Sequence, residues 1–479
     1  MQQTKVGEQN LYNLFGRFSL VLVLLSSIAY AESFADFKRV QTESFTQFKD
    51  KRDDEFKKYL KEQWQEYRKY VEVPLYTKPK PKTIVPAKPQ KPKVAGPLVN
   101  IKLLDNLEPK REIITPVIVK NKSSEISYFG SSIGFSIDEE LKNAKYYPHS
   151  QKGVANFFTT LASSDYETIL AEIKQVAQNL QLNDWGKYLL IKELSRKFYE
   201  NEDEQKLFTW FILNKLSYNV KVALANQHIL LLINSKQTIY ATPRYKFKGH
   251  YFYVLDETQR HKKIYTYPQD YPDADKSFDF RLSRLPLFQE DKEGKSLYFK
   301  EYGKEYSAEF QYNKNLINFF ATYPQVSYEV YFSTPMEYQT YRDIAQDLKE
   351  YIDGKKASVA IDFLLKFVQK AFIYEVDQEQ FSKEKVMFAE ETLVYNKSDC
   401  EDRAVLFAYL VKNLLGISVV GVKYPDHMAT ALYIPMQGDS VRVGKRRYVI
   451  ADPTYINATV GESMPKYRSI KPQKFIMVK

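Results

Sequence analysis

The stretch NKSDCEDRAVLFAYLV, residues 396–411, decides how the rest of the chain is interpreted. It starts as a polar loop and continues as an amphipathic helix, for which Ser398 or Asp399 is a natural N-cap. Cys400, the only cysteine among 479 residues, then falls in the first helical turn. Backbone N–H groups and the helix dipole favour a thiolate there, and the same groups can stabilise an oxyanion. The stretch therefore predicts a nucleophilic cysteine.

Two further residues, both downstream of Cys400 in the sequence, complete a predicted catalytic arrangement. His427 follows Cys400 by 27 residues, just before a predicted strand at 429–434, and Asp452 follows 25 residues later, after a predicted strand at 447–451. Two adjacent strands packed on the cysteine helix would bring the three side chains together. His427 is expected to take the thiol proton and pass it to the leaving group, and Asp452 to fix the histidine tautomer.

Three motifs resemble the bacterial branch of the transglutaminase-like superfamily: Ser-Asp-Cys-Glu-Asp-Arg-Ala around Cys400, His-Met-Ala-Thr-Ala from His427, and Asp-Pro-Thr-Tyr from Asp452. The resemblance covers about residues 358–460. It implies a papain-like α+β core that transfers acyl groups through a thioester, for peptide hydrolysis, amide cleavage or cross-linking. It also implies an oxyanion-supporting side chain upstream of the cysteine, for which Gln369 and Tyr374 are the candidates.

Other roles for these residues have less support. A lone cysteine is more often a small core residue, but the N-cap, the histidine and the Asp-Pro-Thr sequence together favour the nucleophile. Glu401 and Asp402 are expected to interact with the helix dipole or with Arg403. A metal site at Cys400 would need further ligands at paired spacing, so we predict no metal and no other cofactor.

An upstream segment repeats the pattern in altered form. Residues 201–220 match 400–419 at a constant offset of 199, and the same offset relates His228 to His427. An offset of 196 relates Asp256 to Asp452. We therefore expect tandem transglutaminase-like domains, the first a pseudoenzyme because Asn201 replaces the cysteine. Convergence of two helix–strand–strand units is the alternative.

The N-terminal part has three compositional segments. Residues 1–31 have the charged start, short apolar run and small-x-small ending of a cleaved signal peptide. Residues 32–72 contain pairs of aromatic residues repeated every eleven residues from 34 to 70, which predicts one long helix with an aromatic stripe. That stripe would pack on the chain's own globular part, self-associate in a coiled coil other than a strict heptad, or bind an envelope partner. The linker at 73–97, rich in proline and lysine, predicts an extended, basic spacer outside any core.

The rest of the chain is globular and α+β. We predict an α+β domain at 98–262 that contains the altered copy, a β-rich connecting region at 263–337, and the transglutaminase-like catalytic domain at 338–479. No apolar run after the signal peptide is long enough to span a membrane.

The leading interpretation is an exported cysteine enzyme, periplasmic or otherwise extracytoplasmic in a bacterium, that hydrolyses a peptide or amide bond of a peptide or protein substrate in the cell envelope. A non-catalytic envelope binding or scaffold protein and a protein cross-linking acyltransferase are the alternatives. The net charge of +11 is interpreted as solvated surface, and nucleic-acid binding is not predicted because no recognised motif accompanies it.

Overall fold

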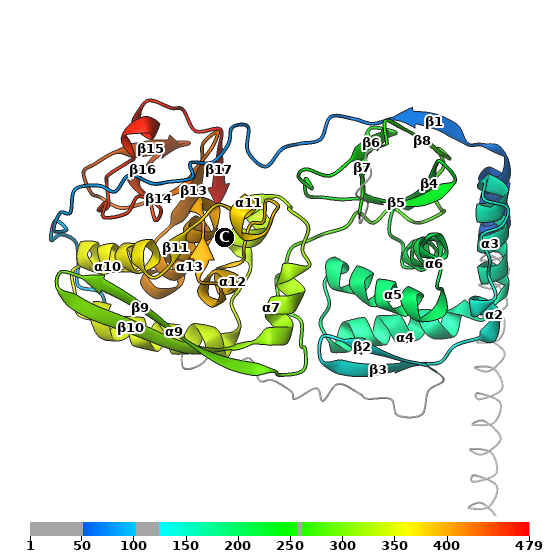
Figure 1. Cartoon of the computed structure of the whole chain (residues 1–479), viewed down its shortest axis with the longest axis horizontal. Coiled ribbons are helices and arrows are strands. Elements are labelled where there is room, and N and C mark those ends of the chain that lie inside the picture. Colours follow the sequence, from blue (N-terminus) through cyan, green and yellow to red (C-terminus); the bar gives the residue numbers. More distant parts are fainter. Residues whose placement is uncertain (1–50, 102–123, 256–260, 479) are drawn as a thin grey trace, which may run out of the picture. The chain divides into compact units, whose positions relative to one another are not determined.

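The computed structural model describes residues 51–101, 124–255 and 261–478 (Figure 1). The chain divides into two units, residues 1–63 and 64–479. Within the first unit, residues 51–62 form a helix. The predicted signal peptide, the predicted helix up to residue 50, and Asp256 lie outside the described residues.

The second unit is mixed α+β with antiparallel sheets. Its N-terminal lobe begins with a hairpin and five helices: β2 Ser124–Tyr128, β3 Ser131–Phe135, α2 Glu139–Lys142, α3 Gln151–Ser163, α4 Tyr166–Asn179, α5 Asp184–Phe198 and α6 Glu202–Lys215. A six-stranded sheet follows in the order β1-β8-β4-β5-β7-β6. Its strands are β1 Gln65–Arg68, β4 Val220–Ala225, β5 His228–Asn234, β6 Arg244–Phe247, β7 His250–Val254 and β8 Lys263–Thr266.

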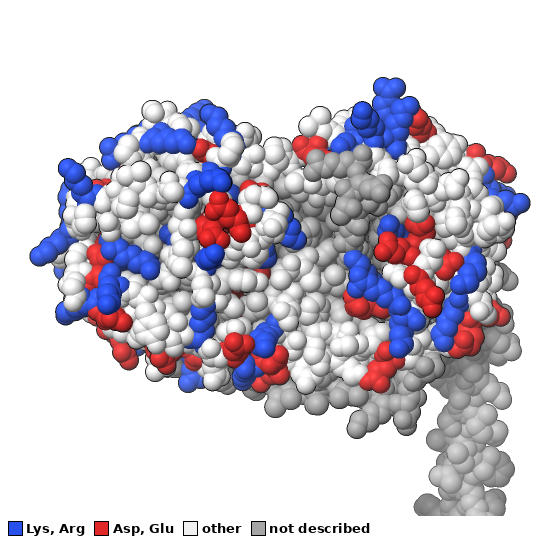
Figure 2. Space-filling model, in the orientation of Figure 1, with Lys and Arg blue, Asp and Glu red and all other residues white. Residues whose placement is uncertain are grey.

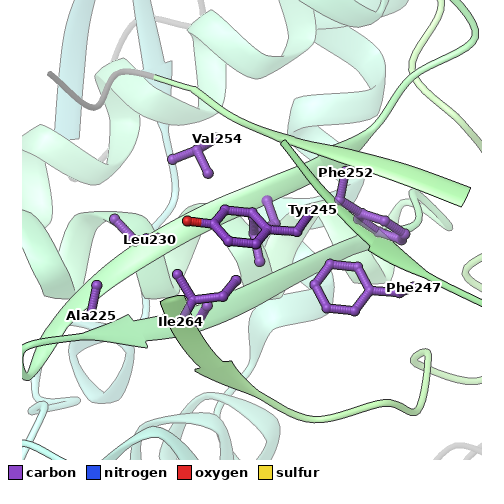
Figure 3. Close-up of a cluster of buried hydrophobic side chains, with 9 residues drawn as sticks. Ala225, Leu230, Tyr245, Phe247, Phe252, Val254 and Ile264 are labelled. Atoms are coloured by element: carbon purple, nitrogen blue, oxygen red, sulfur yellow. The ribbon is translucent and has the colours of Figure 1, made fainter. Parts of the chain in front are cut away.

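This six-stranded sheet is nearly closed. Beyond β1, the backbone N–H of Tyr70 donates to Arg244 O at 2.9 Å, which links the two edges of the sheet. The inner face is apolar, as Figure 3 shows for Leu230, Phe247 and Phe252 among others. Burial of such side chains stabilises the sheet by about 1.5–3 kcal/mol each.

The structure corrects the predicted helix at 32–72. Residues 65–68 form β1, which pairs with β8 so that Tyr67 lies opposite Ile264. Tyr67 packs edge-on against Phe247 of the apolar face, with ring centroids 4.5 Å apart. The eleven-residue aromatic repeat fits a helix, but its last members gain more from completing the sheet, because tertiary packing overrides local periodicity.

Between the lobes in sequence lie a long hairpin and two helices: β9 Lys292–Glu301, β10 Lys304–Asn313, α7 Lys314–Ala321 and α8 Tyr328–Ser333. The sequence predicts only strands and loops here. The helix α7 forms because Leu316, Ile317, Phe319 and Phe320 recur at helical spacing and are all buried.

The C-terminal lobe holds the predicted cysteine helix at its centre. Its elements are α9 Tyr338–Ile352, α10 Ala357–Lys370, β11 Ile373–Tyr374, α11 Asp377–Gln380, α12 Ala389–Val394, β12 Lys397–Ser398, α13 Cys400–Leu415, β13 Val419–Lys423, β14 Met428–Leu432, β15 Ser440–Val443, β16 Arg446–Ala451, the 3₁₀ turn η1 Pro465–Arg468 and β17 Lys474–Met477. The helix α13 packs against α10, α12, β13 and β14. It ends at Gly416, whose φ of 65° is the left-handed conformation that terminates helices.

The two lobes share one strand order. The C-terminal sheet runs β15-β16-β14-β13-β17, and the N-terminal sheet without β1 runs β6-β7-β5-β4-β8. In each sheet the first two strands after the central helix form a hairpin in the middle, and the last strand returns to pair with the first of them. All these pairings are antiparallel.

Residues 74–90, which we call the strap, cross the C-terminal lobe as an extended segment (blue in Figure 1). The sequence predicts a spacer outside any core. Instead, Leu75, Lys80 and Ala87 are buried, with 3%, 9% and 9% of their surfaces exposed. The chain remains extended, as its proline content favours, but its side chains find specific partners.

On the face shown in Figure 2, Lys and Arg side chains are interspersed with Asp and Glu and form no continuous basic surface among the described residues. None of the described helices combines the length and apolar character that crossing a bilayer requires.

Candidate active site

The helix α13 begins at Cys400, with Asp399 as its N-cap residue. The Asp399 N–H donates to the Asp402 carboxylate at 3.1 Å, and the Met387 N–H donates to the same carboxylate at 2.8 Å. Asp402 therefore holds the helix start in place by accepting these two backbone N–H groups. Every residue from Cys400 to Ala408 is buried, so the first turn lies inside the lobe.

His427 and Asp452 form a buried pair. The Nε2 atom of His427 lies 2.8 Å from Asp452 Oδ2, and the two side chains are 1% and 2% exposed. The other carboxylate oxygen of Asp452 accepts the N–H of Thr454 at 3.0 Å. The Nδ1 atom of His427 is buried and has no hydrogen-bond partner within the described part of the chain.

An aromatic ring fixes the imidazole plane. Tyr467 stacks on His427 with centroids 4.7 Å apart and an interplanar angle of 20°. Its hydroxyl donates at 3.2 Å to Asp426, the residue before His427. This hydrogen bond holds the Tyr467 ring beside the histidine. Burial raises the pKa of Tyr467, and the Asp426 carboxylate raises it further.

The Cys400 thiol hydrogen-bonds to its sequence neighbour and not to His427. Its Sγ donates to Glu401 Oε2 at 3.1 Å. The hydroxyl of Tyr76, on the strap, donates to the same carboxylate oxygen at 2.9 Å and lies 3.7 Å from Sγ. The thiol is fully buried.

The surroundings of the thiol oppose its ionisation. Burial raises the pKa of Cys400 well above its ordinary value, and the Glu401 and Asp399 carboxylates raise it further, against the opposing effect of the Lys80 ammonium. The sequence predicts the opposite direction from the helix dipole alone. The dipole, worth about 0.3–1 kcal/mol, is outweighed by the loss of solvation and by the two carboxylates.

Four carboxylates that we call the acidic pocket converge on Lys80 of the strap. They belong to Asp377, Glu384, Asp399 and Glu401. The Lys80 ammonium donates to Asp377 at 2.9 Å, to Glu401 at 3.0 Å and to Asp399. Asp377, Asp399 and Glu401 are completely buried.

Protonation states in the acidic pocket follow from these contacts. Burial opposes a charge on Lys80, but Asp399, Glu401 and Asp377 more than offset that effect and raise the pKa of the ammonium. Lys80 in turn overcomes the burial of Glu401 and lowers its pKa to about 2. Burial and the neighbouring carboxylates raise the pKa of Asp377 to about 8 and that of Asp399 well above its ordinary value.

The two candidate oxyanion side chains use their donors elsewhere. The amide nitrogen of Gln369 faces the carbonyl oxygens of Asp452, Tyr455 and Ala458 at 3.1, 2.8 and 3.2 Å. It thereby holds the loop after Asp452. The Tyr374 hydroxyl donates to Pro81 O of the strap at 2.7 Å. An oxyanion role for either side chain stays a prediction.

A buried arginine holds the loop that precedes the cysteine. Arg403 is fully buried, and its guanidinium donates to Ser398 Oγ at 3.0 Å, Phe372 O at 2.8 Å and Gln369 O at 3.4 Å. Burial lowers its pKa to about 10. These bonds fix α10, β12 and the start of α13 relative to one another.

Asn201 and His228, the two counterparts in the N-terminal lobe that the structure describes, form no such site. Asn201 is the N-cap of α6, where its side chain accepts the N–H groups of Asp203 and Glu204 at 2.8 and 3.2 Å. The His228 side chain is 77% exposed, with Nδ1 at 3.2 Å from Asp203 Oδ2.

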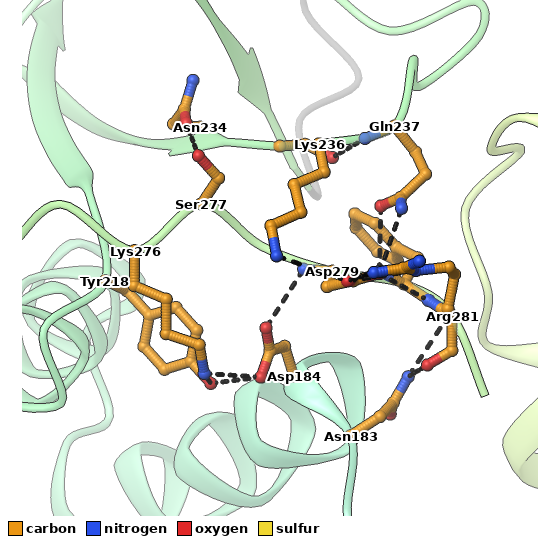
Figure 4. A network of polar contacts seen from close by, with 12 residues as sticks. Asn183, Asp184, Tyr218, Asn234, Lys236, Gln237, Lys276, Ser277, Asp279 and Arg281 are labelled. Atoms are coloured by element: carbon orange, nitrogen blue, oxygen red, sulfur yellow. Dashed lines mark hydrogen bonds and ion pairs between the residues drawn. The ribbon is translucent and has the colours of Figure 1, made fainter. Parts of the chain in front are cut away.

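Polar groups of the N-terminal lobe gather instead around the start of α5 (Figure 4). Asp184 accepts hydrogen bonds from Tyr218 Oη at 2.5 Å and Lys276 Nζ at 2.9 Å. A hollow of about 500 Å³ adjoins this network, lined by Asn183, Lys276 and Arg281 among others. None of the predicted catalytic residues lines it.

Sequence reasoning missed the side chains that cover the thiol. Tyr76 and Lys80 lie in the segment predicted as a spacer, more than 290 residues before their partners. Asp377 and Tyr467 carried no motif either. One signal for this contact was available: single lysines alternate with prolines in an extended segment. This pattern spaces side chains regularly along a chain that is able to bind in a groove.

Comparison with known proteins gave no match to any family model, curated protein or solved structure.

Proposed function

We propose that this protein is an exported cysteine acyl-transfer enzyme of the transglutaminase-like type that hydrolyses a peptide or amide bond in the cell envelope. The observation that carries the proposal is the buried His427–Asp452 pair at 2.8 Å. Asp452 engages Nε2, and the Nδ1 that remains has no partner among the described residues. Nδ1 is therefore the nitrogen that would accept the thiol proton.

The reaction would proceed in two acyl-transfer steps. His427 Nδ1 removes the proton of Cys400 as the sulfur attacks the substrate carbonyl carbon. Backbone N–H groups in the first turn of α13 stabilise the resulting oxyanion. The carbon–nitrogen bond then breaks, the imidazolium protonates the amine, and a thioester remains. Water activated by His427 hydrolyses the thioester to a carboxylic acid and restores the thiol.

For the first step, the Cys400 thiol must break its hydrogen bond to Glu401 and form one to His427. We expect a change of the Cys400 side-chain rotamer to allow this, because Cys400 lies on α13, which packs against β13 and β14, and His427 immediately precedes β14. Displacement of Tyr76 would remove the hydroxyl that shares the Glu401 oxygen.

We also propose that the N-terminal lobe is a degenerate copy of the catalytic lobe. The common strand order and the offset of 199 that relates α6 to α13 support this. Without a thiol at Asn201 and with a mostly exposed His228, the N-terminal lobe would form no thioester.

Trapping of an acyl-enzyme tests the proposed activity. The protein is mixed with p-nitrophenyl acetate, quenched in acid and weighed by mass spectrometry. We expect one acetyl group per chain on Cys400, removable by hydroxylamine, with none on the Cys400→Ala variant. We also expect slower formation and slower hydrolysis of the acetyl-enzyme in His427→Gln. Acetylation of Cys400 at a rate that His427→Gln does not change would contradict the proposal.

A non-catalytic binding role is the second candidate. The burial of the thiol under Tyr76 favours it, since burial raises the thiol pKa and so opposes formation of the thiolate. Failure to acetylate Cys400 under any condition in which the protein stays folded would favour this candidate over the enzyme. A cross-linking activity would show instead as transfer of the acetyl group to an added amine in preference to water.

A further inference from the structure

The strap lies on the C-terminal lobe as a peptide lies in a binding groove. The N–H groups of Thr77 and Lys78 both donate to Pro425 O, at 3.1 and 3.0 Å, two residues before His427. The N–H of Ala87 donates to Ile456 O at 2.8 Å, in the loop after Asp452. Loops that carry two of the predicted catalytic residues therefore hold the backbone of an extended segment, which is how enzymes and peptide-binding domains hold extended ligands.

Two strap side chains lie at the Cys400 thiol or in the pocket beside it. The Tyr76 hydroxyl lies 3.7 Å from Sγ of Cys400, and its ring lies under the Lys423 ammonium at 4.4 Å from the centroid. Four residues further, Lys80 enters the acidic pocket, two of whose carboxylates belong to the residues on either side of Cys400. The strap thus fills the space over the thiol and an adjoining charged pocket.

The acidic pocket requires a cation that can donate several hydrogen bonds. All three ammonium hydrogens of Lys80 are used by the buried carboxylates of Asp377, Asp399 and Glu401. Leaving a buried carboxylate without its cation is strongly destabilising, so we expect the pocket to take up another positive charge when the strap leaves. A primary ammonium on a long aliphatic chain supplies the charge, the three donors and the reach.

We propose that the strap is an internal stand-in for the substrate, and that the acidic pocket receives the ammonium side chain of a peptide substrate when the strap leaves. The inference rests on the proposed function for the statement that Cys400 acts on that peptide. It assigns the substrate class as an extended peptide with a lysine-like side chain, and it assigns Asp377, Asp399 and Glu401 as the residues that select it.

The first test measures how strongly the strap covers the thiol. Cys400 is the only cysteine, so iodoacetamide labelling of the full chain reports this residue alone. We expect Lys80→Ala to label at least tenfold faster than the unmodified protein when each rate is corrected for that protein's own pH profile of labelling, because loss of the Lys80 ammonium by itself raises the thiol pKa. The matched control is Lys82→Ala, because Lys82 is two residues away, its side chain is 76% exposed, and it pairs only with the surface residue Glu379 at 2.9 Å. The control should label at the original rate.

The second test measures what the pocket selects. Lys80→Ala lacks a propylammonium group, so added propylammonium should slow labelling and raise the melting temperature, whereas propanol should do neither. Nα-acetyl-lysine N-methylamide should protect Cys400 at least fivefold better than the norleucine analogue, which has the same four-carbon side chain without the ammonium group. Equal protection by both analogues would overturn the assigned substrate class. Protection by calcium ions and not by propylammonium would also overturn it.

A further variant keeps the test valid if Lys80→Ala does not fold. Tyr76→Ala leaves the four ion pairs of Lys80 intact and removes the ring over the thiol, so it should label several-fold faster. A folded Tyr76→Ala or Lys80→Ala protein that labels no faster than the unmodified protein would show that the strap does not cover the site. Failure of the proposed function is distinct from this, because it appears as labelling that does not depend on His427.

Discussion

The two lobes share one strand order but differ in the polar side chains that they bury. In the C-terminal lobe, the start of the central helix and the ends of two strands meet in a buried polar site, with His427 only 1% exposed. In the N-terminal lobe, the residue related to His427 is 77% exposed, and Asn201 serves only as a helix cap. An α+β framework of this kind is stable without catalytic residues, so chemistry depends on which polar groups the framework buries together.

The largest expected difference between the lobes is in the two histidines. In His427→Gln the rate of Cys400 acetylation should fall by about 100-fold or more, the usual contribution of a positioned general base. The matched variant His228→Gln should acetylate at the original rate, because this histidine is exposed and belongs to the other lobe. Similar rates for the two variants would contradict the distinction between the lobes.

A second difference concerns packing of the first strand after the central helix. A Cβ atom on Gly421 of β13 would lie 2.9 Å from Phe332 Cζ and 3.3 Å from Ile476 Cβ, whereas the residue at the offset of 199 is the buried Val222. Gly421→Val should therefore lower the free energy of unfolding by about 1–3 kcal/mol in urea titrations. Gly294→Ala on β9, which meets no atom within 4 Å, is the control and should change it by less than about 0.5 kcal/mol.

The third difference is in pH dependence. Burial raises the pKa of Glu390 from 4.5 to about 8, so between these values the folded C-terminal lobe binds more protons than the unfolded chain. Its stability should fall as pH rises through this window, by up to about 1.4 kcal/mol per pH unit for this group. Hydrogen exchange at pH 5 and 8, corrected for the intrinsic rate, should show that loss in peptides of the C-terminal lobe.

Glu390→Gln is the matched variant for that effect. The carboxyl accepts the Glu337 N–H at 2.8 Å and adjoins the Thr340 hydroxyl at 3.0 Å, and an amide can make both contacts without a charge. The variant should be more stable than the unmodified protein at pH 8 and similar to it at pH 5. A larger loss of stability in the variant at pH 8 would show that the carboxyl is ionised in the folded state.

The smallest expected effect belongs to Asn201. If this residue is only a helix cap, Asn201→Ala should cost about 1 kcal/mol in urea unfolding, and Asn201→Asp should cost almost nothing. Neither substitution should alter acetylation of Cys400. A loss of acetylation in Asn201→Ala would mean that the N-terminal lobe contributes to the site.

Local sequence signals predicted the elements around the site well. The helix α13 begins at Cys400, so that the cysteine lies in the first turn as predicted, because its N-cap is a local feature. The strands after His427 and before Asp452 lie within two residues of their predicted positions. The pairing of His427 with Asp452 also followed from the sequence, since both side chains sit at the ends of adjacent strands.

What the sequence could not predict depends on contacts between distant segments. The composition of the strap predicts an extended chain, but nothing local indicates that Lys80 meets carboxylates about 300 residues away. For the same reason the helix dipole alone does not indicate that burial and two carboxylates raise the thiol pKa in this buried arrangement. Residues 65–68 likewise form a strand because their partner β8 lies far along the chain.

The central claim is that Cys400 is activated by His427 once the strap is displaced. The measurement that tests it most directly is the pH profile of iodoacetamide labelling in Tyr76→Ala, which opens the site over the thiol and keeps the Lys80 ammonium beside its carboxylates, compared with the same variant carrying His427→Gln. We predict an inflection well below about 8.5, the value of an ordinary thiol, which moves upward when His427 is replaced. An inflection at or above about 8.5 that His427→Gln leaves unchanged would contradict the claim.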